Sequence, residues 1–193
     1  MSKNLIIVIF CFLFLCCRGE SNDCKNSYQK AKINLNKYYE DRSSSHLDSA
    51  LYYANQLSAC TEYKVRAVNL KITVYTLLKK YEMGCKYVDS LNVNDFSLPY
   101  QKTLYMKTFE GLSFEQRDDY TKRNACYKEI VAEIERYLNT NPLDKNAIAD
   151  LFYTKLKYEE KKVVINEINL MQSQKKNDKE FFEALKETIN AME

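Results

Sequence analysis

Glycine, proline, histidine and tryptophan are scarce in this chain of 193 residues, which has three glycines, two prolines, one histidine and no tryptophan. Tight turns between strands depend on glycine and proline, so their scarcity disfavours sheets and leaves helix as the expected state. A single histidine, His46, leaves little for a metal site or for general acid–base catalysis at neutral pH. The scarcities therefore predict an all-α protein that is not an enzyme and holds no metal or cofactor.

Charge of one sign is not in excess either. The 29 basic residues nearly balance the 26 acidic ones, and the net charge is +3. This balance gives no reason to expect a nucleic-acid partner. The chain also lacks a glycine-rich phosphate loop, G-x-S-x-G and H-E-x-x-H, the motifs that would indicate common enzyme classes. The expected partner is a protein or a peptide.

What the sequence does have is an apolar run at its start, from Leu5 to Cys17, preceded by Lys3. A run of this length fits a signal peptide, whereas a membrane-spanning helix needs about 20 apolar residues. We therefore expect residues 1–17 to be a signal peptide, 18–26 a short tether and 27–192 the exported domain. An uncleaved anchor helix is the alternative reading of the run.

The end of the signal allows two outcomes. The segment Leu13–Cys17 resembles a bacterial lipobox, and this resemblance implies acylation of Cys17, or of Cys16, with the protein anchored to a membrane such as the outer membrane and facing the periplasm or the cell surface. In the other outcome, Cys17 and Gly19 precede an ordinary cut near residue 19, and the protein is secreted. We favour the lipoprotein because cysteines end the apolar run and because the Lys-, Asn-, Ile- and Tyr-rich composition resembles that of a low-GC bacterium.

Four cysteines remain in the body of the protein: Cys24, Cys60, Cys85 and Cys126. In an oxidising compartment, four cysteines allow three pairings. Antiparallel packing of the first two helices would bring Cys24 to Cys60, and Cys85 could then pair with Cys126 between neighbouring hairpins. The alternative is a set of four buried thiols.

A repeat with an offset of thirty-four residues organises the body of the chain. Three residues spaced by four and then three recur at this offset: Ala50, Ala54 and Leu57 as Gly84, Val88 and Leu91, and Ile130, Ile134 and Tyr137 as Val164, Ile168 and Met171. This spacing puts each set on one face of a helix. Other periodic segments alternate with these four helices, at 27–40, 61–80, 100–115 and 143–157. A last segment, 178–192, with Asn177 and Glu180 in capping positions, presents Phe181, Phe182, Leu185 and Ile189 to the end of the array.

At these positions the chain resembles the tetratricopeptide-repeat family, in which each unit of thirty-four residues is a helical hairpin. Ala50 and Gly84 match the small residue at the head of the second helix, Tyr81 and Tyr127 match the preceding aromatic residue, and Pro142 matches the proline near the end of a unit. The chain departs from the motif at other positions: Ile130 and Val164 replace the small residue. The resemblance implies a stack of about four antiparallel hairpins with a C-terminal capping helix and a concave groove for a protein or peptide.

Sixteen tyrosines are available for such a groove, and tyrosine makes large and rather rigid contacts. Tyr38, Tyr53 and Tyr105 lie opposite the core stripes and are our candidates for partner binding. His46 is expected as a solvated residue in the first turn of a helix that Ser45 and Asp48 cap. The charged segment 116–123 falls where the repeat frame slips, and is either a recognition loop or a surface extension.

Two functions follow from this reading. The first is a non-catalytic binding protein that acts as an assembly subunit or neutralises a toxin. The alternative is a hydrolase or lyase of cell-envelope polymers that uses carboxylates, such as the pairs Asp118–Asp119 and Glu159–Glu160.

Overall fold

The computed structural model describes residues 19–174 and 178–192, and within these ranges it contains nine α-helices, three short 3-10 helices and no strand. The predicted all-α class is confirmed. The signal segment with Cys16 and Cys17, and the capping residue Asn177, lie outside the described residues. The described residues divide into two compact units, which we call unit 1 and unit 2; unit 1 ends at Ser97 and unit 2 begins at Leu98.

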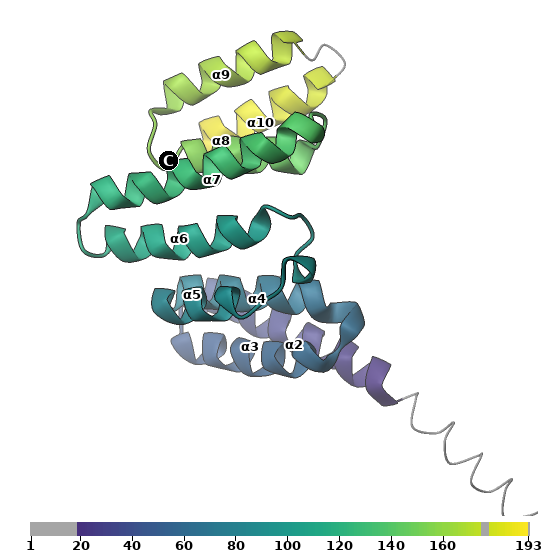
Figure 1. The fold of residues 1–193 in the computed structure, drawn as a ribbon. Coiled ribbons are helices and arrows are strands. Elements are labelled where there is room, and N and C mark those ends of the chain that lie inside the picture. The colour runs from purple at the N-terminus through teal and green to yellow at the C-terminus, as the bar shows by residue number, and fades with distance from the viewer. Residues whose placement is uncertain (1–18, 175–177, 193) are drawn as a thin grey trace, which may run out of the picture. The chain divides into compact units, whose positions relative to one another are not determined.

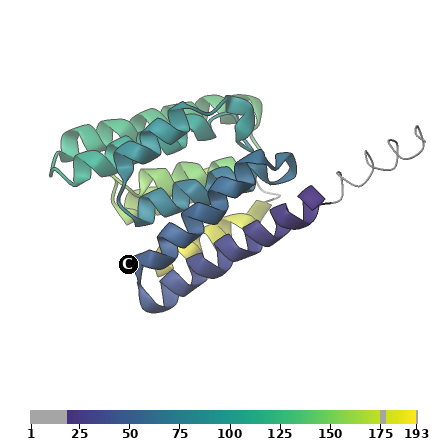
Figure 2. The ribbon, with the colours of Figure 1, turned by 90° about the horizontal axis from the view of Figure 1, so that it is seen from below.

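From Gly19 on, unit 1 has four α-helices connected by short turns (Figure 1 and Figure 2): α2 Gly19–Asp41, α3 Ser44–Gln56, α4 Lys64–Leu77 and α5 Tyr81–Asp89. It also has 3-10 turns at Leu57–Ala59, Thr61–Tyr63 and Val93–Asp95. Because α2 begins at Gly19, most of the segment expected as a tether is helical. Small side chains let the first three helices approach closely, since Ala31, Ala54 and Ala67 are buried in one cluster with Leu57 and Leu70. A second cluster joins Leu47, Ala50 and Val74.

The described part of unit 2 has five α-helices (Figure 1): α6 Gln101–Glu115, α7 Tyr120–Thr140, α8 Lys145–Lys155, α9 Lys161–Gln174 and α10 Lys179–Ala191. One core cluster lies between α7 and α8 and includes Tyr100, whose hydroxyl donates to Asp150 Oδ2 at 2.8 Å. The other cluster joins α8, α9 and α10. In it, Phe182, Leu185 and Ile189 of α10 are buried. Removing these side chains from water is what holds the last helix on the unit.

Ten of the twelve residues that define the repeat lie in α-helices, whereas Leu57 is in the 3-10 turn after α3 and Leu91 follows α5. Nine of the twelve are buried: Ala50, Ala54, Leu57, Gly84, Val88, Ile130, Ile134, Val164 and Ile168. Leu91, Tyr137 and Met171 are half-buried. The stripe spacing thus identifies the faces that pack, while the tetratricopeptide-like stacking of the hairpins stays a prediction.

Three hairpin turns use a left-handed residue other than glycine. Arg42, Lys79 and Asp118 have φ of 60°, 55° and 58° and follow α2, α4 and α6. At two of these turns the backbone closes in the way typical of helix ends, because Lys80 N donates to Tyr75 O at 2.9 Å and Asp119 N to Phe114 O at 3.0 Å. The chain therefore makes its turns with few glycines, at the cost of local backbone strain.

Only the first half of the charged segment 116–123 is a turn, between α6 and α7. Residues 120–123 form the first turn of α7, and the Asp119 side chain caps this helix by accepting from Lys122 N at 3.1 Å. The ammonium of Lys122 also lies 3.0 Å from Asp119 Oδ2, and the two contacts with Lys122 lower the pKa of Asp119. Charged residues are common in loops, but an aspartate is also a favoured N-cap residue, and Asp119 has this second role.

Candidate binding groove at the disulfide

A disulfide joins the beginning of α2 to the chain just after α3. The Sγ atoms of Cys24 and Cys60 are 2.01 Å apart and their Cα atoms 6.1 Å apart. The antiparallel arrangement of α2 and α3 brings the two residues to the same end of the hairpin (Figure 1).

The second expected bridge is not formed, since Cys85 and Cys126 are thiols. Cys85 belongs to α5 of unit 1, whereas Cys126 is buried within unit 2, where its Sγ lies 3.8 Å from Glu110 Oε2. Burial raises the pKa of the Cys126 thiol.

A groove of about 500 Å³ lies at the disulfide end of α2 and α3. We call it the disulfide groove, and its lining is Asp23, Cys24, Asn26, Ser27, Lys30, Tyr52, Tyr53, Gln56 and Cys60. Its volume falls in the range of about 300–1,000 Å³ that is typical of ligand sites. Aromatic rings, amides and charges of both signs therefore share one concave surface.

Tyr52 and Tyr53 form the aromatic part of this surface. Their ring centroids are 5.2 Å apart in an edge-to-face arrangement, and Tyr52 is 60% exposed. Lys30 Nζ lies 5.3 Å from the centroid of the Tyr53 ring, so a cation covers this tyrosine. The Tyr52 ring packs against the Tyr53 ring and is still exposed, so it offers an incoming side chain an aromatic contact surface.

Polar contacts fix the rest of the groove. Ser27 Oγ donates to Gln56 Oε1 at 2.9 Å and links α2 to α3 across the groove. On the same part of unit 1, the Arg66 guanidinium lies 5.4 Å from the Tyr28 ring and 5.2 Å from the Tyr63 ring. Both tyrosines pack on the core cluster beneath the disulfide. Tyrosine and arginine are the residue types enriched where proteins bind other proteins.

The structure places the three candidate tyrosines in different surroundings. Tyr53 lines the disulfide groove. Tyr38 lies eight residues beyond Lys30 on α2, about 12 Å along the axis, and packs against the cluster of Leu47 and Ala50. Tyr105 is half-buried in α6 of unit 2, and burial raises its pKa. The sequence analysis did not identify Lys30 and Gln56 as residues of this surface. The expected Cys24–Cys60 pairing could have indicated them, because it brings the start of α2 next to the end of α3.

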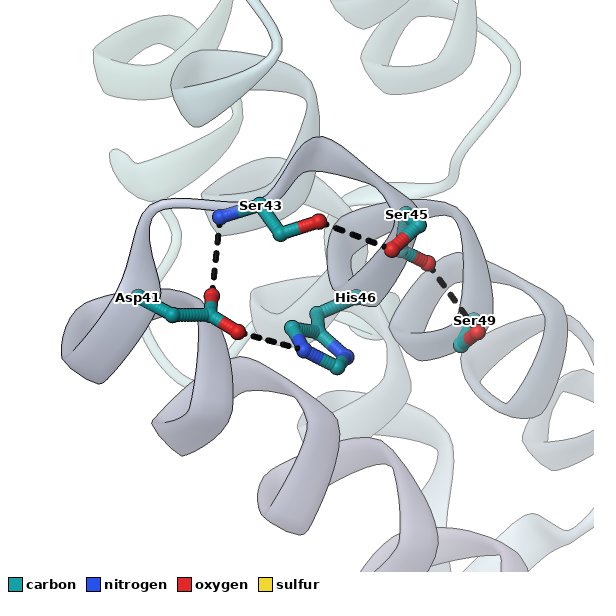
Figure 3. Close-up of polar contacts among 5 residues, drawn as sticks. All are labelled: Asp41, Ser43, Ser45, His46 and Ser49. Carbon is teal, nitrogen blue, oxygen red and sulfur yellow. Dashed lines mark hydrogen bonds and ion pairs between the residues drawn. The ribbon is translucent and has the colours of Figure 1, made fainter.

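His46 is in the first turn of α3, but it is half-buried and paired (Figure 3). Its Nε2 lies 3.0 Å from Asp41 Oδ2, and Asp41 Oδ1 accepts from Ser43 N at 2.8 Å. The Ser43 backbone contact, followed by His46, lowers the pKa of Asp41. The expected cap was therefore wrong: the N-cap residue of α3 is Ser43, whose side chain makes no capping hydrogen bond, and Ser45 and Asp48 lie within the helix.

This cluster contains serine, histidine and aspartate but not a catalytic arrangement. Among the five residues drawn in Figure 3, the hydroxyls of Ser43 and Ser45 are 2.9 Å apart, and Ser49 Oγ donates to Ser45 O. The hydrogen bonds drawn for these hydroxyls therefore do not involve the His46 imidazole. A nucleophile activated by histidine needs a hydrogen bond between the two. The cluster instead fastens the turn between α2 and α3.

Another pair does place a hydroxyl beside a base. Lys71 Nζ donates to Ser58 Oγ at 2.7 Å and lies 4.9 Å from the centroid of the Tyr87 ring. Lys71 is 8% exposed, and desolvation lowers its pKa. In its charged form this ammonium is a donor, which leaves the Ser58 hydroxyl as acceptor.

In the part of the chain that the structure describes, no three His, Cys, Asp or Glu side chains gather as metal ligands. Over the same residues, none of the helices is both long and apolar enough to cross a membrane. Comparison with protein-family models, curated proteins and solved structures finds no match for this chain.

Proposed function

We propose that this chain is an exported, lipid-anchored binding protein with a tetratricopeptide-like stack of hairpins and no catalytic role. The observation that carries the proposal is the disulfide groove, where Tyr52, Tyr53 and Lys30 line a concave surface of about 500 Å³. Exposed tyrosine beside a cation suits recognition of a protein or peptide, because a ring adds contact area at little cost in side-chain entropy.

The disulfide supports the export part of the proposal. Disulfides persist in oxidising compartments and are rare in the cytosol. The first cysteine of the bridge, Cys24, lies shortly after the apolar segment that we interpret as a signal peptide. A lipid on Cys17 would place the disulfide groove close to the membrane, because only six residues separate Cys17 from Cys24.

In this setting the protein acts as an assembly subunit of the envelope or as a neutraliser of an incoming toxin. Both roles need a surface and a partner, and neither needs a reaction centre. The test is affinity purification from envelope fractions, followed by measurement of the dissociation constant for the purified partner.

Two exposed tyrosines on the same hairpin provide a matched pair of variants. Tyr52→Ala, in the disulfide groove, should weaken binding at least tenfold, about 1.4 kcal/mol. Tyr39→Ala removes a ring that is 49% exposed, at the other end of α2, and should leave the affinity unchanged. Equal affinities of the two variants would contradict the proposed groove.

The lipid anchor has its own test. Cys17→Ser should release the protein from the membrane fraction and remove the mass of an acylated cysteine from its first residue. If Cys16 is the acylated residue, only Cys16→Ser will have this effect. Membrane association that survives both substitutions contradicts the lipoprotein reading.

The alternative function, an envelope hydrolase, is favoured by one contact, between Ser58 and Lys71. Of the carboxylate pairs on which it first rested, Asp118–Asp119 has a structural role, because Asp119 caps α7 and Asp118 makes the preceding turn. If the chain is a hydrolase, a fluorophosphonate probe will label it on Ser58, and Ser58→Ala will abolish the labelling. We expect no labelling of either protein.

A further inference from the structure

Unit 2 contains a second groove, between α7 and α9 and above α8. We call it the α7–α9 groove. Its volume is about 610 Å³, and its lining is Glu135, Leu138, Asn139, Pro142, Leu151, Phe152, Lys155, Glu167, Leu170, Met171 and Gln174. By its lining residues, α8 supplies the floor of this groove and α7 and α9 supply its walls.

The floor and both walls of this groove carry apolar side chains. Leu151 and Phe152 are buried in the floor, and Leu138 and Met171 are half-buried in the walls. Leu170 is 63% exposed on the α9 wall. The wall residues Leu138, Met171 and above all Leu170 thus keep apolar surface whose removal from water would favour binding.

The two walls have the same pair of residue types at the same spacing. Each has a glutamate followed three residues later by a leucine: Glu135 and Leu138 on α7, and Glu167 and Leu170 on α9. Both glutamates approach one ammonium, because Lys155 Nζ lies 2.5 Å from Glu167 Oε2 and 3.9 Å from Glu135 Oε1. The carboxylates therefore mark one end of the groove, and the leucines lie about one helical turn away.

Charge is not balanced at the carboxylate end. Two carboxylates share a single lysine, whose side chain is only 14% exposed, while that of Glu135 is 54% exposed and makes the longer contact. Nearby, the pKa of Tyr158 is raised by burial and then by Glu159, Glu135 and Glu167. Lys128 Nζ lies 5.9 Å from the Tyr158 ring and offsets part of this field. A negative charge is left for an incoming cation.

The helical walls of the groove favour a bound segment that is itself helical. Both are α-helices, whose backbone groups are already paired within the helix, so an extended peptide would find no backbone partners over the apolar floor. A helix satisfies its own backbone and buries one face, as in other helix-in-groove complexes.

We infer that the α7–α9 groove binds an amphipathic helix of a partner protein, with a lysine or arginine beside Glu135 and apolar side chains one turn away over Leu138 and Leu170. This site lies in unit 2 and does not depend on the disulfide groove, so the two can fail separately. A variant at Tyr52 would not affect it.

The test uses three synthetic helices of sixteen residues and the full chain. The first has apolar residues on one face with lysines one turn away, the second has glutamate in place of each lysine, and the third scrambles the apolar positions. Fluorescence anisotropy should give the first helix a micromolar dissociation constant, at least about tenfold tighter than the other two. Equal binding of the lysine and glutamate helices would overturn the inference.

Variants then locate the site. Leu170→Ser should weaken the lysine helix about tenfold, and Glu135→Gln about threefold with a smaller salt dependence, because Glu167 still holds Lys155. The control is Val163→Ser, which changes an exposed apolar residue of α9 outside the groove. Hydrogen exchange should show protection of α7 and α9 by the bound helix. Protection confined to unit 1, or an effect of Val163→Ser equal to that of Leu170→Ser, would reject the site.

Discussion

At the scale of single residues, Lys71 is a buried basic side chain whose hydrogen bond and aromatic contact are with uncharged groups. It is 8% exposed, and its ammonium meets a hydroxyl and an aromatic face, Ser58 and Tyr87. Neither group neutralises the charge, and taking a charged group from water costs more than such contacts return. The lowered pKa of Lys71 reflects this cost.

Lys71→Met should therefore raise the free energy of unfolding by about 1 kcal/mol at neutral pH, since a flexible apolar chain of similar length fills the same space. Urea denaturation followed by circular dichroism measures the change. Lys86→Met, which alters an exposed lysine of α5, is the control and should change stability by less than about 0.5 kcal/mol. A loss of stability in Lys71→Met would mean that the ammonium contacts outweigh its desolvation.

The same residue gives a dependence on pH. Because its folded pKa lies below the ordinary value of 10.5, the unfolded chain binds the lysine proton more tightly. Stability of the native chain should therefore rise as the pH passes the folded pKa and approaches 10.5, and the advantage of Lys71→Met should shrink over this interval. Denaturation of both proteins at pH 7 and pH 10 measures the difference, and a constant gap would contradict the assignment.

At the scale of elements, the hairpin turns hold backbone strain that glycine would relieve. Lys79 has φ of 55° and is exposed between α4 and α5. Lys79→Gly should raise the free energy of unfolding by about 0.5–1 kcal/mol, because glycine adopts this conformation without a Cβ clash. The neighbouring Lys80 has φ of −87°, so Lys80→Gly should bring no gain. Thermal unfolding of the two variants compares them, and equal shifts would contradict the argument from φ.

Helices and their buried faces could be predicted from sequence because both follow from contacts within a few residues. Stripes such as Ile130, Ile134 and Tyr137 repeat every turn, and each of the expected segments contains a helix. The turns were harder, since Asp119 reads equally well as part of a charged loop or as a cap. Gly111 was missed for another reason: a Cβ there would lie 3.2 Å from the Tyr127 ring across the hairpin, a distance that no local pattern records.

The candidate sites were the least predictable part, because each joins side chains from separate helices. Glu135, Lys155 and Glu167 meet only once α7, α8 and α9 have packed. Tyr53 could be named from its position opposite a core stripe, but the cation above it comes from α2. The spacing of residues along one helix predicts which of them share a face. Which residues of other helices meet that face depends on tertiary packing.

At the scale of the whole molecule, the disulfide links stability to compartment. It closes a loop with a sequence separation of 36 residues. Reduction should therefore lower the free energy of unfolding by about 3–4 kcal/mol, through the greater freedom of the unfolded chain. Urea denaturation with and without reductant measures this loss, and in the Cys24→Ser/Cys60→Ser variant the reductant should have no further effect. A wild-type chain indifferent to reductant would show that the bridge is not formed in solution.

The oxidation state of each cysteine in the native compartment is the last prediction. We expect protein recovered from cells, denatured without reductant and treated with iodoacetamide, to carry the label on Cys85 and Cys126, because both are thiols. Cys24 and Cys60 should react only after reduction, since their sulfurs are joined. Peptide mapping by mass spectrometry separates the four positions. Labelling of Cys24 and Cys60 before reduction would place the protein in a reducing compartment and remove the main support for export, whereas protection of Cys85 and Cys126 would restore the second bridge that the sequence suggested.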